Sequence, residues 1–237
     1  MLSRITNSLK GRTLRLSARL STVAYWKLRA LFYGQQSVLH VGHRPEDYDA
    51  VTRKQRDFLF PLLAKQLRGD EQWILDFGCG PGRFTPDLAK LIGGRSTGVD
   101  PTGSLLRQAP RSPDTDYRVI RRGIIPADDA SLDIVWVCLV LGGIVNQDAV
   151  EQAAAEIDRC LKPEGLLFLV ENTADAPSTN TWCFRTVEQL DDLFPSVTLR
   201  KIGEYDDLGQ AISVVTGRKE VSVVTTGSLP DPDKDVS

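Results

Sequence analysis

The chain has 237 residues, of which 41% are hydrophobic and 25% charged, and its formal net charge is −2. This length and apolar content are enough for one sizeable core, so we expect a single α/β domain with appendages. No apolar run approaches the roughly 20 residues that a membrane-spanning helix needs, and the four cysteines have no paired metal-ligand spacing, so we expect a cytoplasmic protein without a metal site.

Residues 1–45 form a basic arm with eight lysines or arginines and no acid, which leaves 21 basic and 31 acidic groups in the remaining 192 residues. Apolar residues in the arm recur at spacings of three and four, and this pattern predicts one or two amphipathic helices. These residues are Leu16, Leu20, Val23, Tyr25, Leu28 and Phe32. Three interpretations stay open: a lid over a neighbouring site, contact with an anionic membrane or another polyanion, and an organelle transit peptide.

Residues 46–217 contain the patterns of an α/β domain. Apolar positions between Tyr48 and Leu63 predict a helix, and residues 73–77 predict a buried strand that ends in a glycine-rich turn. Thr85 and Pro86 are expected to open the next helix, with the threonine hydroxyl as its cap. The turn therefore suggests a ligand cradle at a helix N-terminus, although a tight turn without a ligand is the plainer alternative.

A second predicted strand, residues 95–100, ends in Asp100, which lies 24 residues after Asp76. A carboxylate at the tip of the neighbouring strand suits the hydroxyls of an adenosine ribose, as found in both dinucleotides and S-adenosylmethionine. The glycines are spaced Gly78-x-Gly80-x-Gly82, which differs from the dinucleotide pattern Gly-x-Gly-x-x-Gly. Because an acid beside a pyrophosphate is unfavourable, Asp76 favours the cofactor that carries an ammonium and a sulfonium.

The motif Asp-x-Gly-x-Gly-x-Gly over residues 76–82, together with the acid at position 100, resembles the class I S-adenosylmethionine-dependent methyltransferases. The resemblance covers about residues 70–217. It implies a doubly wound, Rossmann-like α/β fold whose seven-stranded sheet is mostly parallel with an antiparallel last strand. It also implies cofactor contacts at Asp76, Gly78, Cys79, Gly80, Asp100, Pro101, Ile124 and Cys138. The helix before the motif would offer Tyr48 or Arg53 to the amino-acid end of the cofactor.

The remaining elements follow the same family order. We expect a short helix at 102–106, strands at 117–120 and 132–141, a helix at 147–161, a turn at 162–165, a strand at 166–171, a loop at 173–181, a helix after Thr186, and antiparallel strands at 197–204 and 210–216. The acidic, proline-bearing tail at 218–237 is predicted to be disordered.

Two positions depart from the pattern of the resembled family. Arg121-Arg122-Gly123-Ile124 stands where relatives place an acid for adenine, so backbone groups near Gly123 and Ile124 are expected to bind it. Gly143 stands where many relatives carry a histidine at the reaction centre. The catalytic residues are therefore unknown from sequence, and a role for Glu171 as general base is left open.

The resemblance implies direct displacement of the methyl group, and we expect O-methylation of a small hydroxylated molecule, a glycan or a lipid-linked acceptor. The acceptor pocket is predicted between the arm and residues 172–185. Its expected residues are Arg29, Arg44, Arg185, Tyr25, Trp26, Phe32 and Trp182. The alternative is that these aromatic residues only pack the arm onto the sheet. A catalytically inactive methyltransferase-fold binding protein and a nicotinamide-dependent oxidoreductase remain alternative functions, and no nucleic-acid partner is expected.

Overall fold

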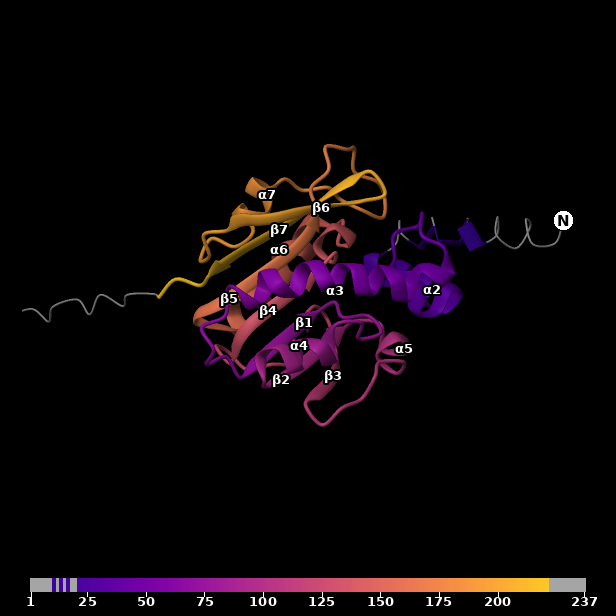
Figure 1. Ribbon diagram of the computed structural model, residues 1–237. Coiled ribbons are helices and arrows are strands. Elements are labelled where there is room, and N and C mark those ends of the chain that lie inside the picture. The colour runs from indigo at the N-terminus through magenta and orange to yellow at the C-terminus, as the bar shows by residue number, and fades with distance from the viewer. Residues whose placement is uncertain (1–9, 12, 15, 18–20, 222–237) are drawn as a thin grey trace, which may run out of the picture.

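The computed structural model describes residues 10, 11, 13, 14, 16, 17 and 21–221, and every structural statement below concerns these residues. Their centre is a seven-stranded sheet in the order β3-β2-β1-β4-β5-β7-β6 (Figure 1). The strands are β1 (Trp73–Phe77), β2 (Arg95–Asp100), β3 (Thr115–Val119), β4 (Leu132–Cys138), β5 (Leu161–Asn172), β6 (Arg200–Asp207) and β7 (Gln210–Arg218). β7 runs antiparallel to both of its neighbours, so the predicted mostly parallel sheet with an antiparallel last strand is confirmed.

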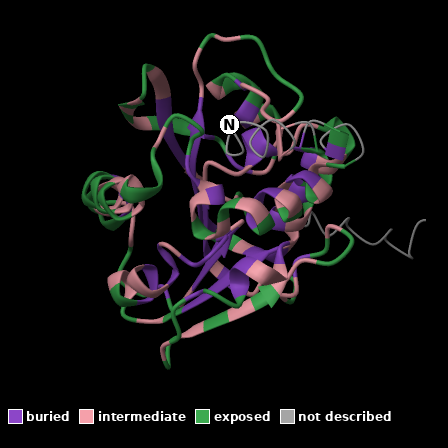
Figure 2. Ribbon diagram, turned by 90° about the vertical axis from the view of Figure 1, so that its right-hand side faces the viewer, coloured by how far each residue is buried: buried purple, intermediate pink, exposed green. Residues whose placement is uncertain are grey.

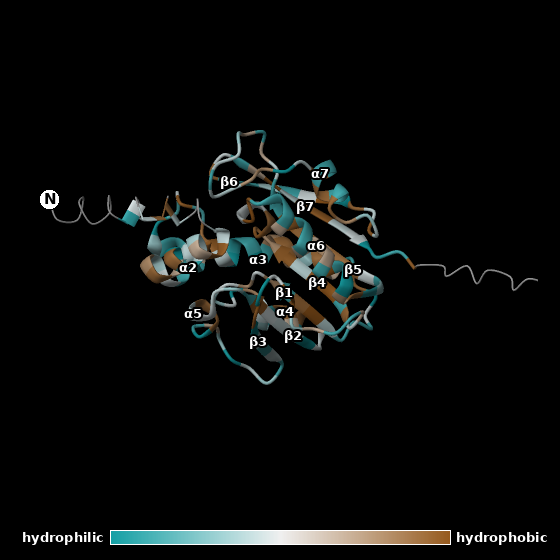
Figure 3. Ribbon diagram, turned by 180° about the vertical axis from the view of Figure 1, so that it is seen from behind, coloured by the Kyte–Doolittle hydropathy of each residue, from teal (hydrophilic) through white to brown (hydrophobic). Residues whose placement is uncertain are grey.

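Helices cover both faces of the sheet. α3 (Tyr48–Ala64) and α4 (Thr85–Ile92) pack on one face, while α6 (Gln147–Cys160) and α7 (Val187–Asp192) pack on the other (Figure 3). The short α5 (Gly103–Leu106) lies beside β2 and β3. This arrangement is the doubly wound α/β architecture that the sequence predicts.

Each central strand is buried on both faces (Figure 2). Along β4, Ile134 and Trp136 face the core under α3 and α4, while Val135 and Val137 face the core under α6. The Trp136 ring stacks on Phe168 of β5 with the centroids 5.0 Å apart. Apolar runs without polar alternation are typical of such strands, because helices cover both of their sides.

The sheet order reverses between β1 and β4. From β1 the chain moves outward to β2 and β3, then returns to the other side of β1 to form β4 and β5. Adjacent crossover connections that leave in opposite directions open a crevice at the carboxyl ends of the two central strands. The residues after Phe77 and after Cys138 therefore lie at the natural ligand site of this fold.

In the described part of the arm, residues 10, 11, 13, 14, 16 and 17 are helical, and α2 (Thr22–Tyr33) is followed by the 3-10 turns η1 (Gly34–Val38) and η2 (Pro45–Asp47). The buried side of α2 is formed by Tyr25, Arg29 and Ala30. Leu16 and Val23, which the spacing had placed on the apolar face, are 61% and 39% exposed, so the prediction is wrong for both. For Val23 the reason is that the buried Arg29 turns its own side of α2 inward. Its guanidinium donates to the carbonyl oxygens of Ser37 and Leu39 at 2.6 and 2.9 Å.

Several boundaries differ from the sequence predictions. β4 ends at Cys138 and not at Leu141, because Leu141–Gly143 forms the 3-10 turn η3. β5 already begins at Leu161 and includes the expected turn at 162–165, where a register shift and the positive φ of Glu164 accommodate the extra residues. β6 begins three residues late, since Val197 makes only an isolated bridge to Lys219. Disorder was predicted for residues 218–237. The prediction is wrong for Arg218 and Lys219, because Arg218 ends β7 and Lys219 forms the bridge to Val197, and residues 222–237 lie outside the described part of the chain. No helix among the described residues is long and apolar enough to cross a membrane.

Candidate functional site

A cavity of about 730 Å³ lies at the carboxyl ends of β1, β2 and β4, and we call it the main cavity. Six of the eight predicted cofactor residues line it: Asp76, Gly78, Cys79, Asp100, Pro101 and Cys138. Gly80 and Ile124 do not. Its other walls come from α2 and η1 of the arm and from residues 121–123 after β3. The fold thus brings together most of the predicted residues, which lie up to 62 positions apart in the chain.

The glycine-rich turn is shaped by its protein neighbours. The N–H groups of Gly78 and Cys79 both donate to the carbonyl oxygen of Val99, at 2.8 and 3.1 Å. A Cβ on Gly78 would lie 2.5 Å from the Val140 side chain, and one on Gly80 would lie 2.7 Å from Val38 of the arm. The expectation that these N–H groups face a ligand is therefore corrected for positions 78 and 79, because they tie the turn to β2.

Asp76 is buried at the end of β1, and its Oδ2 accepts a 2.6 Å hydrogen bond from the Thr85 hydroxyl. This corrects the predicted helix cap: α4 starts at Thr85 itself, and the hydroxyl holds the acid instead of capping the helix. Burial raises the pKa of Asp76 to about 7, against the lowering effects of Thr85 and the nearby positive charge of Arg83. A cationic ligand group beside this buried carboxyl group would stabilise its ionised form and lower its pKa.

Asp100 joins β2 to the glycine-rich turn. Its Oδ1 accepts from the Thr102 N–H at 2.6 Å and its Oδ2 from the Gly80 N–H at 3.1 Å. Burial raises the pKa of Asp100, while these two donors oppose the shift. A carboxylate has about four lone-pair sites, and the two backbone N–H groups and the Thr102 hydroxyl take three of them. The residue can therefore accept a hydrogen bond from a ligand in the main cavity without losing its backbone contacts.

Arg83, which the sequence analysis did not single out, also lines the main cavity. Its Nη1 donates to Gln55 Oε1 at 2.8 Å, and Gln55 Nε2 in turn donates to the Tyr205 hydroxyl at 3.1 Å. Gln55 is only 4% exposed, so this arrangement fixes the guanidinium from behind. The only sequence signal for this role is an arginine directly after the third glycine of the motif.

The helix before the motif contributes through this contact. Neither Tyr48 nor Arg53, the two candidates named from sequence, is among the residues that line the main cavity. Gln55 lies on the same helix and acts on the cavity through Arg83. α3 thus acts on the main cavity as predicted, but through Gln55 and not through Tyr48 or Arg53, because the helix packs behind the residues that form the cavity wall.

The backbone expected to bind adenine is only partly in place. Gly123 lines the main cavity, but the Ile124 side chain is 50% exposed and its N–H donates to the carbonyl oxygen of Arg121 at 3.0 Å. The next N–H, that of Ile125, donates to the Glu156 carboxylate. The amide N–H of Ile124 is thus already paired. Contact with adenine is therefore expected from Gly123 and the side chains before it.

The carboxyl end of β4 continues into a turn that Glu171 holds. The Glu171 carboxylate accepts from the N–H groups of Val140, Leu141 and Gly142 at 2.8, 2.7 and 3.2 Å. Burial raises its pKa, although these donors favour the ionised form. Because both oxygens are engaged with backbone, Glu171 positions the turn and is poorly placed to take a proton from a substrate.

Two tryptophans pack onto the adjacent glycines of this turn. A Cβ on Gly142 would lie 2.5 Å from the Trp182 ring, and one on Gly143 would lie 2.9 Å from the Trp26 ring. Trp26 Nε1 also donates to the Gly143 carbonyl oxygen at 3.2 Å. The glycine found where relatives carry a histidine therefore makes room for a side chain from the arm.

A second cavity of about 250 Å³ lies between the arm and the loop after β5, and we call it the aromatic pocket. Four of the residues that the sequence assigned to an acceptor pocket line it: Tyr25, Trp26, Arg29 and Trp182. Phe32 and Arg44 do not, and Arg44 forms exposed ion pairs with Glu46 and Asp47. The predicted location is therefore occupied by a cavity, but most of the expected arginines are absent from its wall.

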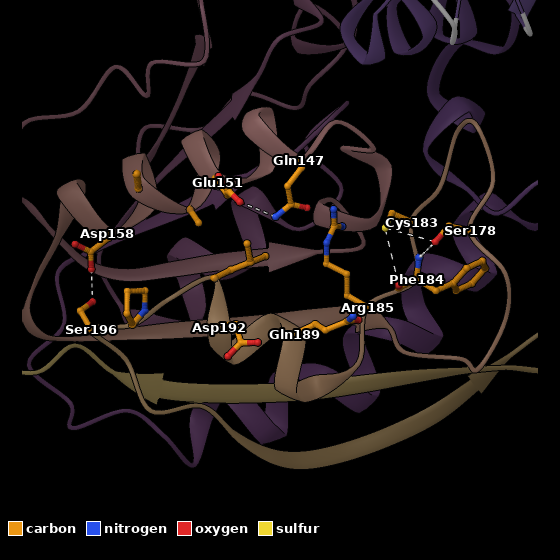
Figure 4. Close-up of a pocket in the computed structure, with 14 residues that line it drawn as sticks. Gln147, Glu151, Asp158, Ser178, Cys183, Phe184, Arg185, Gln189, Asp192 and Ser196 are labelled. Carbon is orange, nitrogen blue, oxygen red and sulfur yellow. Dashed lines mark hydrogen bonds between the residues drawn. The ribbon is translucent and has the colours of Figure 1, made fainter.

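Arg185 lies in a different cavity, a groove of about 780 Å³ between α6 and α7 (Figure 4). Its guanidinium donates to the carbonyl oxygens of Leu141 and Ile144 at 2.8 and 3.1 Å, so it supports the turn after β4. Asp158 accepts a hydrogen bond from Ser196 at the far end of this groove (Figure 4). No residue of the glycine-rich turn lines the groove.

The main cavity and the aromatic pocket share three wall residues, Trp26, Val38 and Leu139. Leu139 follows β4 directly and has a φ of +58°, a left-handed conformation that is uncommon for a residue with a side chain. Its N–H donates to the Val170 carbonyl oxygen at 2.7 Å, which helps to hold this conformation. Two ligands, one in each cavity, would both contact these three residues.

Comparisons with known proteins agree with this geometry. Residues 75–169 match the sequence model of a family described as a methyltransferase domain. An uncharacterised methyltransferase-like protein of Schizosaccharomyces pombe is 34% identical over 131 residues, which are 54% of this chain and 50% of that protein. The chain spans about half the length, or less, of the curated relatives it matches.

Solved structures share the fold at low sequence identity. A SAM-dependent methyltransferase from Methanosarcina mazei superposes with a TM-score of 0.57 at 21% identity, covering 68% of this chain and 98% of that one. The [4+2]-cyclase SpnF superposes with a TM-score of 0.60 at 17% identity, covering 86% and 96%. The second likeness shows that the fold also supports a different named chemistry.

Proposed function

The chain belongs, by its methyltransferase domain, to the class I S-adenosylmethionine-dependent methyltransferases, and from this premise we propose that it methylates a small acceptor held in the aromatic pocket. The observation that carries the proposal is the wall that the main cavity shares with the aromatic pocket. A bound cofactor supplies an activated methyl group, and methyl transfer requires the acceptor to lie directly beside it.

The residues of the main cavity fit this cofactor. Asp76 and Arg83 lie in the same wall and influence each other electrostatically, which suits the ammonium and carboxylate of its amino-acid end. Asp100 has a free lone-pair site for a ribose hydroxyl. These assignments support a cofactor that is held at its amino-acid end and at its ribose, with the sulfonium between these two contacts.

The protein's contribution to the reaction would be alignment and exclusion of water. Trp26, Val38 and Leu139 form an apolar boundary, so a nucleophile that reaches the shared wall is surrounded by side chains that cannot compete with it. For the acceptor we propose an oxygen nucleophile on a small hydroxylated molecule, a glycan or a lipid-linked molecule. Action in the cytoplasm and membrane contact through the arm belong to the same proposal.

A catalytically inactive binding protein is the second candidate. It is favoured by the turn after β4, where Gly143 replaces a histidine and the Glu171 carboxylate is engaged with backbone. The likeness to a [4+2]-cyclase also shows that the fold alone does not require methyl transfer.

Incubation of the purified protein with methyl-labelled S-adenosylmethionine and a small-molecule extract separates the two candidates. Calorimetry first establishes whether the cofactor binds. We expect binding together with a labelled product; binding without transfer to any acceptor would favour the inactive protein. Deletion of residues 1–44 removes Trp26 and Val38 from the walls of both cavities and should abolish transfer; because the arm also lines the main cavity, cofactor binding by the folded remainder is measured separately by calorimetry. Full-rate transfer by the truncated protein would exclude the arm from the acceptor site.

A further inference from the structure

We propose that the acceptor is an aromatic ring carrying a hydroxyl group, which binds in the aromatic pocket and is methylated on the hydroxyl oxygen. The inference rests on the proposed function and narrows its acceptor. It follows from the aromatic side chains and the volume of the pocket, and from the hydrogen bonds that its polar groups already make. It also follows from the three described residues of the shared wall, none of which can accept a proton.

The walls of the aromatic pocket are rings from two separate segments. Tyr25 and Trp26 come from α2, while Trp182 and Phe184 come from the loop after β5. A volume of about 250 Å³ is below the 300–1,000 Å³ typical of sites for drug-sized ligands, so it suits a small ring system or one end of a longer molecule. Aromatic rings favour stacked or edge-to-face contact with another aromatic ring.

Several polar groups that line the aromatic pocket are already paired within the protein, whereas the buried Trp182 indole N–H has no partner among the described residues and can donate to one ligand oxygen. The Arg29 guanidinium donates to two backbone carbonyl oxygens and to the Tyr25 hydroxyl. The Asn172 side chain donates to Gln210 Oε1 at 2.5 Å and accepts from the Ala174 N–H. A sugar would bring several hydroxyls into a pocket that has few partners left for them, and each unpaired hydroxyl would weaken its binding. An aryl ring has no such requirement.

The outer end of the aromatic pocket retains a polar contact. His40 is exposed there, and its Nδ1 accepts from the Gly42 N–H at 3.1 Å. The neutral ring therefore carries its proton on Nε2, which has no partner within the described residues. This N–H can bond one polar substituent at the open end of the ring, and solvent water can reach the same place.

The shared wall contains no ionisable side chain among its three residues, Trp26, Val38 and Leu139. Burial raises the pKa of the nearby Cys138 thiol to about 12, so this thiol is protonated at neutral pH and cannot take a proton from the acceptor. An aryl hydroxyl, like that of tyrosine, ionises with a pKa near 10, whereas an aliphatic alcohol ionises nearer to the 15.7 of water. The carboxylate that lines the aromatic pocket, Asp207, is already paired with His43 Nε2 at 2.8 Å. Because the three residues of the shared wall supply no base, an oxygen held against them must ionise easily, which favours the aryl oxygen.

The step balances with the proposed cofactor as the only co-reactant. The aryl hydroxyl ionises by giving its proton to water, and the phenolate oxygen then forms a bond to the methyl carbon. The sulfur–methyl bond breaks and its electron pair stays on sulfur, which changes from a sulfonium to a thioether. The products are an aryl methyl ether, S-adenosylhomocysteine and a proton.

The test compares 2-naphthol with its saturated counterpart, decahydro-2-naphthol. Calorimetric titration of the full chain, loaded with S-adenosylhomocysteine, should show at least tenfold tighter binding of the aryl compound. Trp182→Leu and Phe184→Leu should each weaken naphthol binding about fivefold, as expected for the loss of one aromatic pair, and leave cofactor affinity unchanged. Phe32→Leu is the matched control, because Phe32 lies on α2 but outside the pocket wall.

Equal binding of the two compounds would overturn the inference, as would faster methylation of a methyl glucoside than of 2-naphthol. If the Trp182→Leu variant does not fold, the Phe184→Leu variant and the comparison of the two ligands still test the inference. The proposed function fails separately: it is refuted if S-adenosylmethionine does not bind, whereas binding and transfer to a sugar would refute only the aryl acceptor.

Discussion

Replacing Asp76 by asparagine should weaken cofactor binding and, at the same time, stabilise the empty protein. Burial raises the Asp76 pKa to about 7, while Arg83 and Thr85 favour its ionised form and Asp100 opposes it. If the ionised form binds the cofactor ammonium, affinity should increase as the pH rises through 7. With this pKa, the apparent dissociation constant should fall roughly tenfold, or about 1.4 kcal/mol, between pH 6 and pH 8.

The stability of the empty protein should change in the opposite direction. The folded pKa lies above the ordinary value of 3.8, so the folded state binds more protons than the unfolded state between these values, and stability falls as the pH rises through this window. The full loss is on the order of 4 kcal/mol above pH 7. Asp76→Asn removes this loss, so the ligand-free variant should melt at a higher temperature at pH 8.

Calorimetry from pH 6 to pH 8 and thermal melts of the ligand-free protein measure the two effects. The wild-type protein should show pH-dependent affinity, and Asp76→Asn should show a low affinity that no longer changes across neutrality. An Asp76→Asn variant that retains the wild-type slope would assign the titration to another group. A variant that binds as tightly as wild type at pH 8 would remove Asp76 from the ammonium site altogether.

Three further predictions concern the main cavity. Asp100→Ala should reduce S-adenosylmethionine affinity by roughly 1–3 kcal/mol, measured by calorimetry on a variant whose circular dichroism is unchanged, and an unaltered affinity would argue against a ribose contact. Gly80→Val should abolish cofactor binding, because its side chain would collide with Val38 and strain a residue at φ +55°, and normal binding in a folded variant would contradict this. Gln55→Leu should weaken cofactor affinity by about 1 kcal/mol through loss of the hydrogen bond that fixes Arg83, whereas Gln55→Glu should retain it; equal affinities of the two variants would refute the positioning role.

The parts of the fold that sequence reasoning predicted are those with strong local patterns. The apolar runs of β1 and β4 and the spacing of Val150, Ala154 and Ile157 on α6 correspond to their observed burial. The acids at the ends of β1 and β2 also line the main cavity as expected. Each of these features is determined by residues within a few positions of one another, and the parallel order of the sheet then follows from the family resemblance.

The contacts that sequence reasoning missed join distant segments. Thr85 has the sequence context of a helix cap, but Asp76 competes for its hydroxyl nine residues away in the chain. The relay from Arg83 through Gln55 reaches Tyr205, which is 150 residues beyond Gln55. No local pattern distinguishes such partners from ordinary surface residues.

The arm shows the same limit. Its aromatic and basic composition predicted the position of a second cavity but not the orientation of its arginines. Arg29 had to be turned inward to satisfy carbonyl oxygens of η1 and the residue after it, and Arg185 had to support the turn after β4. Both uses depend on backbone carbonyl groups, which the identity of the residues does not reveal.

Trp26 has a consequence for the order of events during turnover. It is the arm residue whose ring lies in the walls of both cavities and whose indole N–H is bonded to Gly143. Any motion of α2 that withdraws this ring opens both cavities in one movement. Under the proposed function, exchange of the cofactor and exchange of the acceptor would both be coupled to the position of this one ring.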